Sequence, residues 1–268
     1  MSIVGLANCI FFANAHGGIP EQPNLVTLLF NRFQDTVWAP YLYLWENIFF
    51  SVLAALFISF IFILAARKKE LVPTGLQNFV EGIVEFTRKS IVEILGPEGE
   101  KYVPFLGTLF LYILCMNLFG LVPLLKAPSS SLNITIAQAI VVFILVQYLN
   151  IKNQGLGGFL YHLAGSPKNA VGWMMAPMLF PIELLTQVSR PVTLALRLFG
   201  NMFGEHVLIG YFAFIGLLIL PHIIPTGVPL QIPFMFLGLL TALMQALVFT
   251  LLTTVYILLS SPSSEEHD

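Results

Sequence analysis

The stretch IFFSVLAALFISFIFILAA, residues 48–66, contains no charged side chain, and neither do the runs 103–125 and 132–151. A helix needs about 20 predominantly apolar residues to cross the hydrocarbon core of a bilayer. The whole chain is 57% hydrophobic and 10% charged, whereas soluble domains are about 25% charged. The sequence therefore predicts an all-α polytopic membrane protein. A soluble protein with a large core is excluded, because it would need charged faces that these segments lack.

Basic residues are distributed unevenly between the predicted spans. Only Lys126 lies between the second and third spans, whereas the stretch between the first and second contains Arg67, Lys68, Lys69, Arg88, Lys89 and Lys101. The positive-inside rule places the more basic loop on the cytoplasmic side, or on the equivalent side of an organelle. The N-terminus is therefore predicted outside, and the tail SSPSSEEHD inside after two more crossings.

Residues 1–45 are interpreted as an external segment, and residues 46–268 as the membrane domain. The start MSIVGLANCIFFANAHGG contains Ala13-Asn14-Ala15 after an apolar stretch, as a signal-peptidase site would, but no positive n-region precedes it. Cleavage of residues 1–15 is therefore left open. Cys9 and Cys115 are far apart and lack metal-ligand spacing, so no disulfide framework, metal site or cofactor is predicted.

Residues 74–95 differ from the spans, because apolar residues recur there at helical spacing while charged residues occupy the other faces. This pattern predicts an amphipathic helix on the inner surface of the membrane. The sequence GPEG, 96–99, is expected to end it before the second span.

Two overlong helices are predicted in the last part of the chain. Pro177, Pro181 and Pro191 interrupt the sequence, so the first helix is expected to run from Pro191 to Leu220. Such a helix is about 45 Å long at roughly 1.5 Å per residue, and a perpendicular span needs only about 30 Å. The second helix, 230–260, has the same excess length. We expect a strongly inclined hairpin joined by a proline-rich turn.

The first of these helices contains LALRLFGNMFGEH, residues 194–206, with a charged residue inside an apolar run. At about 100° per residue, Arg190 lies about 20° and Asn201 about 40° from Arg197, Glu205 lies about 80° away, and His206 faces nearly the opposite side. A charge at the bilayer centre costs about 2.5 to 3.5 kcal/mol on insertion scales. Arg197 must therefore meet a partner or water.

Each of these polar residues has two interpretations. Arg197 is either a snorkelling or structurally paired arginine, with Glu183 or Glu205 as partner, or a fixed charge that blocks protons and attracts a carboxylate of another subunit. Glu205 and His206 either form a local bond or carry protons, since both can titrate near working pH. Ionisable residues inside a membrane favour the second interpretation in both cases.

Two amides complete the candidate set. Gln245 lies at the centre of the last predicted helix, where it either joins helices or faces Arg197, and we favour the second. Asn117, in the second span, either lines the same cavity or joins helices.

These residues carry a resemblance to a known family. RPVTLALRLFGNMFGEHVL (190–208) and TALMQALVFTLLTTVYILLSS (241–261) resemble subunit a of F-type ATP synthases, as do MNLFGLVP (116–123), PSSSLNIT (128–135) and PIELLTQVSRPV (181–192). The resemblance covers nearly everything after residue 46. It implies one crossing helix, an amphipathic surface helix, a two-helix hairpin and two inclined helices packed against the c-ring.

The resemblance also implies roles and partners. Arg197 would separate two aqueous half-channels and face the ring's carboxylate, with Asn201 and Glu183 on the inner path, Glu205 and His206 on the outer path, and Gln245 beside the arginine. Partners would be the c-ring, the peripheral-stalk subunit b and lipids, not nucleic acid. Many members carry a titratable residue seven positions before the glutamine; here that position is Gly238, which puts a two-helix relay in doubt.

The resemblance predicts a non-catalytic channel subunit of an ATP-synthesising rotary motor, in a bacterial inner membrane or else a mitochondrial or thylakoid membrane. No G-x-x-x-x-G-K-[ST] motif is present, so nucleotide binding is expected in partner subunits. Whether H⁺ or Na⁺ is the coupling ion is left open. The alternatives are a stand-alone proton-coupled secondary transporter, which should show repeated halves, and a non-conducting scaffold.

Overall fold

The computed structural model describes residues 45–67, 75–122, 125–163, 170–219 and 230–260. The described residues form helices and the turns between them: α4 (Glu46–Arg67), α5 (Leu76–Leu95), α6 (Val103–Phe119), α7 (Leu132–Leu163), α8 (Ala170–Ile219) and α9 (Ile232–Leu259), with two short 3₁₀ helices at Pro97–Tyr102 and Pro128–Ser130. The predicted external segment 1–45 lies, except for Trp45, outside the described residues, as does the tail after residue 260.

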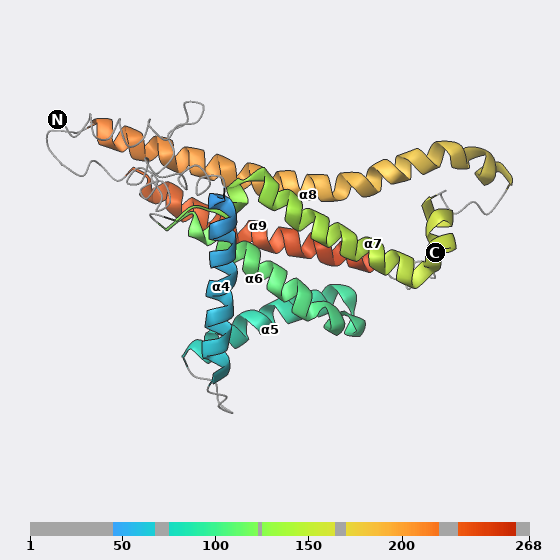
Figure 1. Ribbon diagram of the computed structural model, residues 1–268, viewed down its shortest axis with the longest axis horizontal. Helices are drawn as coiled ribbons and strands as arrows, with labels where there is room; N and C mark the ends of the chain where they lie inside the picture. Colours follow the sequence, from blue (N-terminus) through green and yellow to red (C-terminus); the bar gives the residue numbers. More distant parts are fainter. Residues whose placement is uncertain (1–44, 68–74, 123–124, 164–169, 220–229, 261–268) are drawn as a thin grey trace.

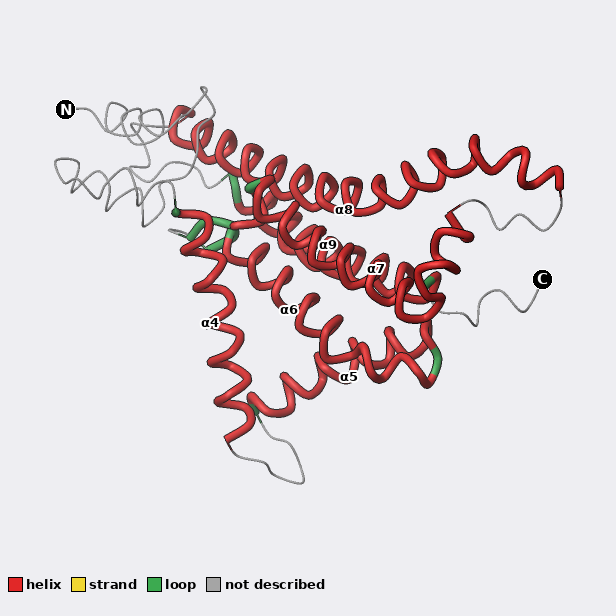
Figure 2. The backbone as a smooth tube through the Cα atoms, turned by 45° about the vertical axis from the view of Figure 1, so that its right-hand side comes forward, coloured by secondary structure: helices red, strands yellow, loops and turns green. Residues whose placement is uncertain are grey.

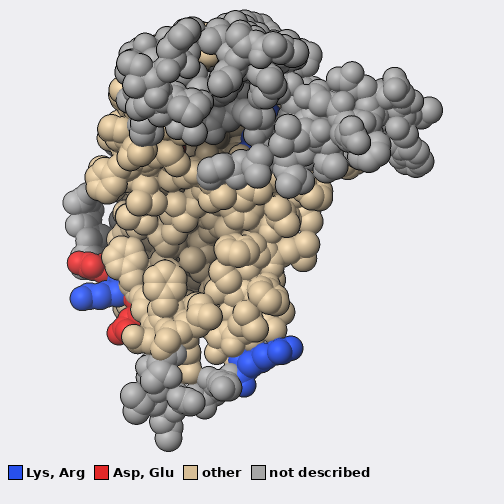
Figure 3. Space-filling model, turned by 90° about the vertical axis from the view of Figure 1, so that its left-hand side faces the viewer, with Lys and Arg blue, Asp and Glu red and all other residues tan. Residues whose placement is uncertain are grey.

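Five of the described helical stretches are long and apolar enough to cross a membrane: Glu46–Arg67, Pro97–Phe119, Leu132–Gly155, Ala176–Gly216 and Ile232–Leu259. The prediction of an all-α polytopic membrane protein is confirmed. In Figures 1 and 2, α4 runs crosswise to α8, α9 and α7, which run along one another. Figure 3 shows charged side chains at the lower left and lower right and a little blue beside the grey atoms at the top, with a broad uncharged band between them.

The predicted amphipathic helix is α5. Its buried residues are Val80, Thr87 and Ile91, while every charged residue on it is exposed. Gly96 ends the helix with φ +70° and donates its N–H to the carbonyl oxygen of Val92 at 2.8 Å. Glycine adopts this left-handed conformation without steric cost. The GPEG stretch therefore ends the helix as expected.

The second span is shorter than predicted, because α6 ends at Phe119 and not at Leu125. The N–H groups of Gly120, Leu121 and Val122 donate to carbonyls three residues earlier, at 3.1, 3.1 and 3.2 Å. This tightening to 3₁₀-type bonds is a common way to end a helix. The third span is longer than predicted, since α7 continues past a break at Gly155, where φ is +73°.

The prediction that a helix starts at Pro191 was wrong. Helix α8 runs without interruption from Ala170 to Ile219 and contains Pro177, Pro181 and Pro191, and Figure 1 shows it as one curved ribbon. Proline removes one donor and bends a helix, but Ser and Thr side chains can bond freed carbonyls in membrane helices. The hydroxyl groups of Thr186, Ser189 and Thr193 donate to the carbonyls of Ile182, Thr186 and Ser189 at 2.8–2.9 Å. These are not the carbonyls that the prolines free, which are those four residues before each proline.

The core lies where α9 packs against α6 and α8. Its largest side chains are fully buried: Phe110, Ile113 and Met116 from α6, Leu194, Leu198 and Met202 from α8, and Phe249 and Ile257 from α9. Small residues on α9, including Ala242 and Ala246, let the helices approach closely. Leu194, Ala195 and Leu198 are buried, whereas Leu196 and Arg197 between them are exposed.

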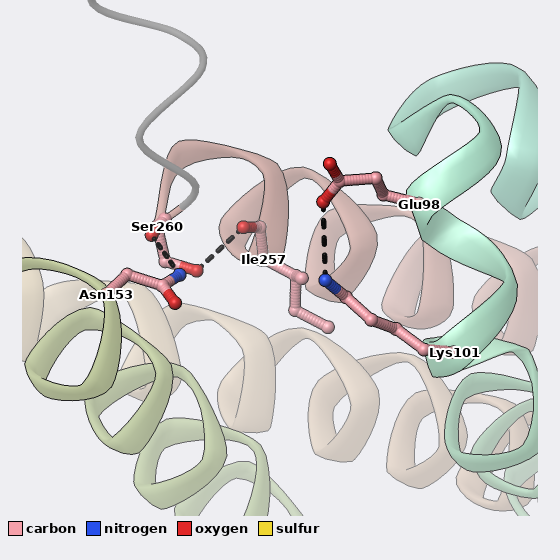
Figure 4. Close-up of polar contacts among 5 residues, drawn as sticks. All are labelled: Glu98, Lys101, Asn153, Ile257 and Ser260. Carbon is pink, nitrogen blue, oxygen red and sulfur yellow. Dashed lines mark hydrogen bonds and ion pairs between the residues drawn. The ribbon is translucent and has the colours of Figure 1, made fainter.

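Polar contacts fix the ends of several elements. The Lys126 ammonium group lies 3.7 Å from the carboxylate of Glu46, which is only 3% exposed, so the segment before α7 is joined to the start of α4. At the opposite end of α7, Asn153 Nδ2 donates to the carbonyl oxygen of Ser260 at 3.0 Å and so satisfies a terminal carbonyl of α9 (Figure 4).

Candidate functional site

Arg197 lies on α8 between the buried Leu194 and Leu198, yet its own side chain is exposed. Leu196, beside it, is 52% exposed. Among the described residues no ion pair joins Arg197 to Glu183 or Glu205, the two partners that the structural interpretation requires. The guanidinium therefore faces outward from the chain, toward lipid or another subunit.

Asn201 follows Arg197 by one helical turn and bonds to α9. Its Nδ2 donates to Gln245 Oε1 at 2.7 Å, and Gln245 is only 3% exposed. We expected Gln245 to face Arg197 as a hydrogen-bonding partner. Among the described residues, the hydrogen bond of Gln245 is with Asn201 instead. Gln245 Nε2 has no partner in the described structure. The pair joins the two inclined helices next to the arginine.

Asn117 joins α6 to α9. Its Nδ2 donates to the backbone carbonyl of Ala242 at 3.3 Å, and the side chain is 1% exposed. This contact favours the interpretation of Asn117 as a residue that joins helices. Its Oδ1, however, is buried without a partner among the described residues, which leaves an acceptor for water.

The Glu205 carboxyl group packs directly on Gly238 of α9. A Cβ atom at position 238 would lie 2.7 Å from Glu205 Cδ and 3.0 Å from Leu121 Cδ2, so no larger residue fits without movement. Glu205 Oε2 is buried, and the described residues supply no hydrogen bond to it. The glycine that put a two-helix relay in doubt thus provides the space that the carboxyl group of α8 occupies.

His206 lies against the end of α6 at Gly120, whereas Glu205 lies against Gly238 of α9. Its Nε2 atom lies 2.7 Å from where a Cβ atom on Gly120 would be, and Ala127 Cβ lies 2.8 Å from the same point. Lys126 directly precedes Ala127, so it also lies near this place. Lys126 and its ion-pair partner Glu46 are therefore two charged residues near the candidate site that sequence reasoning missed. The signal was present, since Lys126 directly follows the predicted span 103–125 and Glu46 lies two residues before the span 48–66.

The structure does not bring all candidate residues together. Along α8, Arg197 stands between Glu183 and Asn201, and the latter two are about 27 Å apart at roughly 1.5 Å per residue. Glu183 is half-buried and makes no ion pair within the described ranges. The shared placement of Glu183 and Asn201 on one inner path stays a prediction.

Several buried polar atoms lack hydrogen-bond partners in the described part of the chain. They are Asn47 Oδ1, Asn117 Oδ1, Ser129 Oγ, Gln138 Oε1, Gln147 Oε1, Glu205 Oε2 and Gln245 Nε2. An unsatisfied buried group costs about 1–3 kcal/mol, so water or another subunit is needed at these places. The set includes three of the candidate residues, Asn117, Glu205 and Gln245.

Comparisons with known proteins agree with this arrangement. The family model described as "ATP synthase A chain" matches residues 48–258. A protein of Protochlamydia amoebophila named ATP synthase subunit a is 59% identical over 255 residues, covering 93% of this chain and 94% of that protein.

Two more distant relatives carry the same name. The protein of Moorella thermoacetica is 39% identical over 194 residues, 72% of this chain and 80% of its own length. The protein of a Sulfurihydrogenibium species is 35% identical over 212 residues, 79% of this chain and 95% of its own length. The chain therefore belongs to the ATP synthase A chain family.

Proposed function

We propose that this chain is the ion-channel stator subunit in the membrane sector of an F-type ATP synthase. It provides two offset half-channels that load and unload carboxyl groups on the c-ring and so couple proton flow to rotation. The observation that carries the proposal is the outward-facing guanidinium of Arg197, within a span and without an ion pair among the described residues. A charge there needs a partner or water, and the proposal assigns it an anionic partner outside the chain.

The surface around Arg197 suits a moving apolar partner. On α9, Phe236 is 75% and Met244 52% exposed, and on α8 Leu185 is 70% exposed. Gly200 and Gly204, on the same helix as Arg197, are exposed and have no side chain of this chain near them. The exposed face of α8 and α9 is therefore proposed as the c-ring contact. Subunit b and lipids are proposed to cover other apolar faces.

The outer half-channel is proposed at Glu205 and His206, with Asn117 near them and Lys126 and Glu46 at its mouth. Glu183 is proposed on the inner path, and Asn201 with Gln245 next to the arginine. Support comes from the buried unpaired oxygen atoms of Glu205 and Asn117, which require water.

During synthesis, a proton crosses the outer path and neutralises a ring carboxylate. Only the neutral carboxyl group can turn into lipid at acceptable cost. After nearly a full turn it loses the proton to the inner path. Arg197 pairs with the ionised carboxylate and prevents protons from passing directly between the paths. The membrane potential supplies about 2.3 kcal/mol per charge per 100 mV.

We propose a bacterial inner membrane as the location, with the N-terminus outside and the C-terminus in the cytoplasm. The basic residues on and after α5 support this orientation, because exposed cations are retained on the cytoplasmic side. Labelling of cysteines introduced at Lys89 and Lys126, in right-side-out and inverted vesicles, tests it. The orientation is wrong if Lys89→Cys reacts from outside.

The function is tested by ATP-driven proton pumping in inverted vesicles that carry the assembled complex. Arg197→Ala and Arg197→Lys are expected to assemble and to lose coupled pumping, because neither can form the bidentate pair of an arginine with a carboxylate. Arg88→Ala is the matched control, since it removes an exposed arginine outside the spans. If Arg197→Ala pumps like the parent, the structural interpretation holds and the proposed function is wrong.

A further inference from the structure

A small cavity lies between α7, α8 and α9, away from the outer candidate residues. Its polar lining consists of Gln147 and Asn150 from α7, Gln187 and Arg190 from α8, and Tyr256 from α9. It leaves about 30 Å³ for the centres of water molecules. A single water needs about 10–15 Å³ by this measure. The cavity therefore has room for water and for nothing much larger.

The hydrogen bonds of the lining are incomplete. Gln147 Nε2 donates to Gln187 Oε1 at 3.0 Å, which joins α7 to α8. Gln147 Oε1 is buried and has no partner among the described residues. The Arg190 guanidinium lies 5.4 Å from the centre of the Tyr256 ring. Arginine offers only donors and an amide oxygen only accepts, so one water could accept from Arg190 and donate to Gln147.

The position of the cavity along α8 relates it to the proposed ion path. Arg190 lies midway between Glu183 and Arg197, seven residues from each. Seven residues correspond to about 10.5 Å of rise and a change of only about 20° in direction. The cavity is therefore on the Glu183 side of Arg197, opposite to Glu205 and His206.

We propose that Gln147, Gln187 and Arg190 hold ordered water in this cavity and that the water forms part of the inner half-channel. This inference rests on the proposed function. The three side chains are positioning residues, because they orient water and do not exchange the proton themselves. The fixed charge of Arg190 opposes storage of an excess proton, so the water passes protons toward the inner phase without retaining them.

Two measurements on the assembled complex test the inference. The first is passive proton conductance of inverted vesicles after removal of the catalytic sector. Gln147→Leu with Gln187→Leu replaces the polar pair by an apolar pair of similar size, and conductance is expected to fall about fivefold, as for loss of one hydrogen-bonded link. Gln77→Leu, on the exposed side of α5, is the matched control and should conduct like the parent.

The second measurement reports hydration directly. Asn150→Cys, in a background with Cys9→Ser and Cys115→Ser, is expected to react with silver ions added at the inner face. The reaction should slow about tenfold when the two leucines are also present, because a dry cavity admits no ion. A merely structural role of the glutamines would not change this rate.

Two outcomes overturn the inference: an Asn150→Cys side chain that does not react, or a double leucine variant that conducts like the parent with normal subunit content. Arg197→Ala measured in the same membranes separates this failure from failure of the proposed function. If Arg197→Ala uncouples while the double variant is normal, only the cavity proposal is wrong. If Arg197→Ala still pumps, the proposed function itself is wrong.

Discussion

The contact between Glu205 and Gly238 makes a quantitative prediction for Gly238→Ala. The new Cβ atom would lie 2.7 Å from Glu205 Cδ, whereas carbon atoms pack at about 3.5–4.0 Å. The carboxyl group must therefore retreat by about 1 Å. Overpacking of this kind costs about 1–3 kcal/mol. That cost acts on stability and is small where a flexible side chain can move. The expected fall in proton pumping, about tenfold, comes instead from misplacing the carboxyl group by about 1 Å.

The assay is ATP-driven acidification of inverted vesicles, followed with a pH-sensitive dye, at equal content of assembled complex. Gly82→Ala is the control, because a Cβ atom there meets nothing within 4 Å. A second variant moves the carboxylate across the contact: Glu205→Gly with Gly238→Glu should pump better than Glu205→Gly alone. Parental pumping by Gly238→Ala, or no rescue by the exchange, would refute the idea that the carboxylate is needed at this contact.

Three further predictions concern other contacts. A double-mutant cycle with Asn201→Leu and Gln245→Leu, measured by pumping rate, should give a coupling energy of about 1 kcal/mol. If the effects of the two substitutions simply add, the hydrogen bond between the two side chains does not contribute to pumping. Lys126→Ala removes an ion-pair partner of the buried Glu46 and should lower the free energy of unfolding in detergent by about 1–3 kcal/mol, with recovery on adding Glu46→Gln. Hydrogen bonding to the Glu100 carboxylate raises the pKa of Arg88 above its ordinary value. Any stability from this pair is therefore present at every pH below the ordinary pKa of arginine and is lost only as the pH rises through the raised pKa. The difference in melting temperature between Arg88→Ala and the parent should therefore be the same at pH 7 and pH 9.

The helices were predictable where composition alone decides the outcome. Charge-free runs such as 48–66 predicted the membrane spans, because the apolar core of a bilayer tolerates few charges. The path of α8 was not predictable from its prolines, which would end a helix in water. In a membrane segment the surrounding helices and lipid can hold such a helix together, and this tertiary effect is not written in the local sequence.

The candidate residues were also easier to find than their contacts. Arg197 and Glu205 were recognisable as ionisable groups in an apolar run, whereas the pairing of Asn201 with Gln245 depends on the register between α8 and α9. That register is set by packing of small buried residues such as Ala242 and Ala246. The periodicity of apolar residues describes one helix at a time and does not fix how two distant helices align. The bond between Gln147 and Gln187 was missed for the same reason.

The continuity of α8 also has a geometric consequence. From residue 183 to residue 205 the helix advances about 33 Å, roughly the thickness of the hydrocarbon core, about 30 Å. Because α8 runs crosswise to α4 (Figure 1), its two ends differ in position along the membrane plane as well as in depth. Under the proposed function, a proton leaving one end can reach the other only on a carrier that travels sideways. The tilt of this one helix therefore sets how far apart the two paths lie around the rotor, and so what part of a turn a loaded carboxyl group must cover between them.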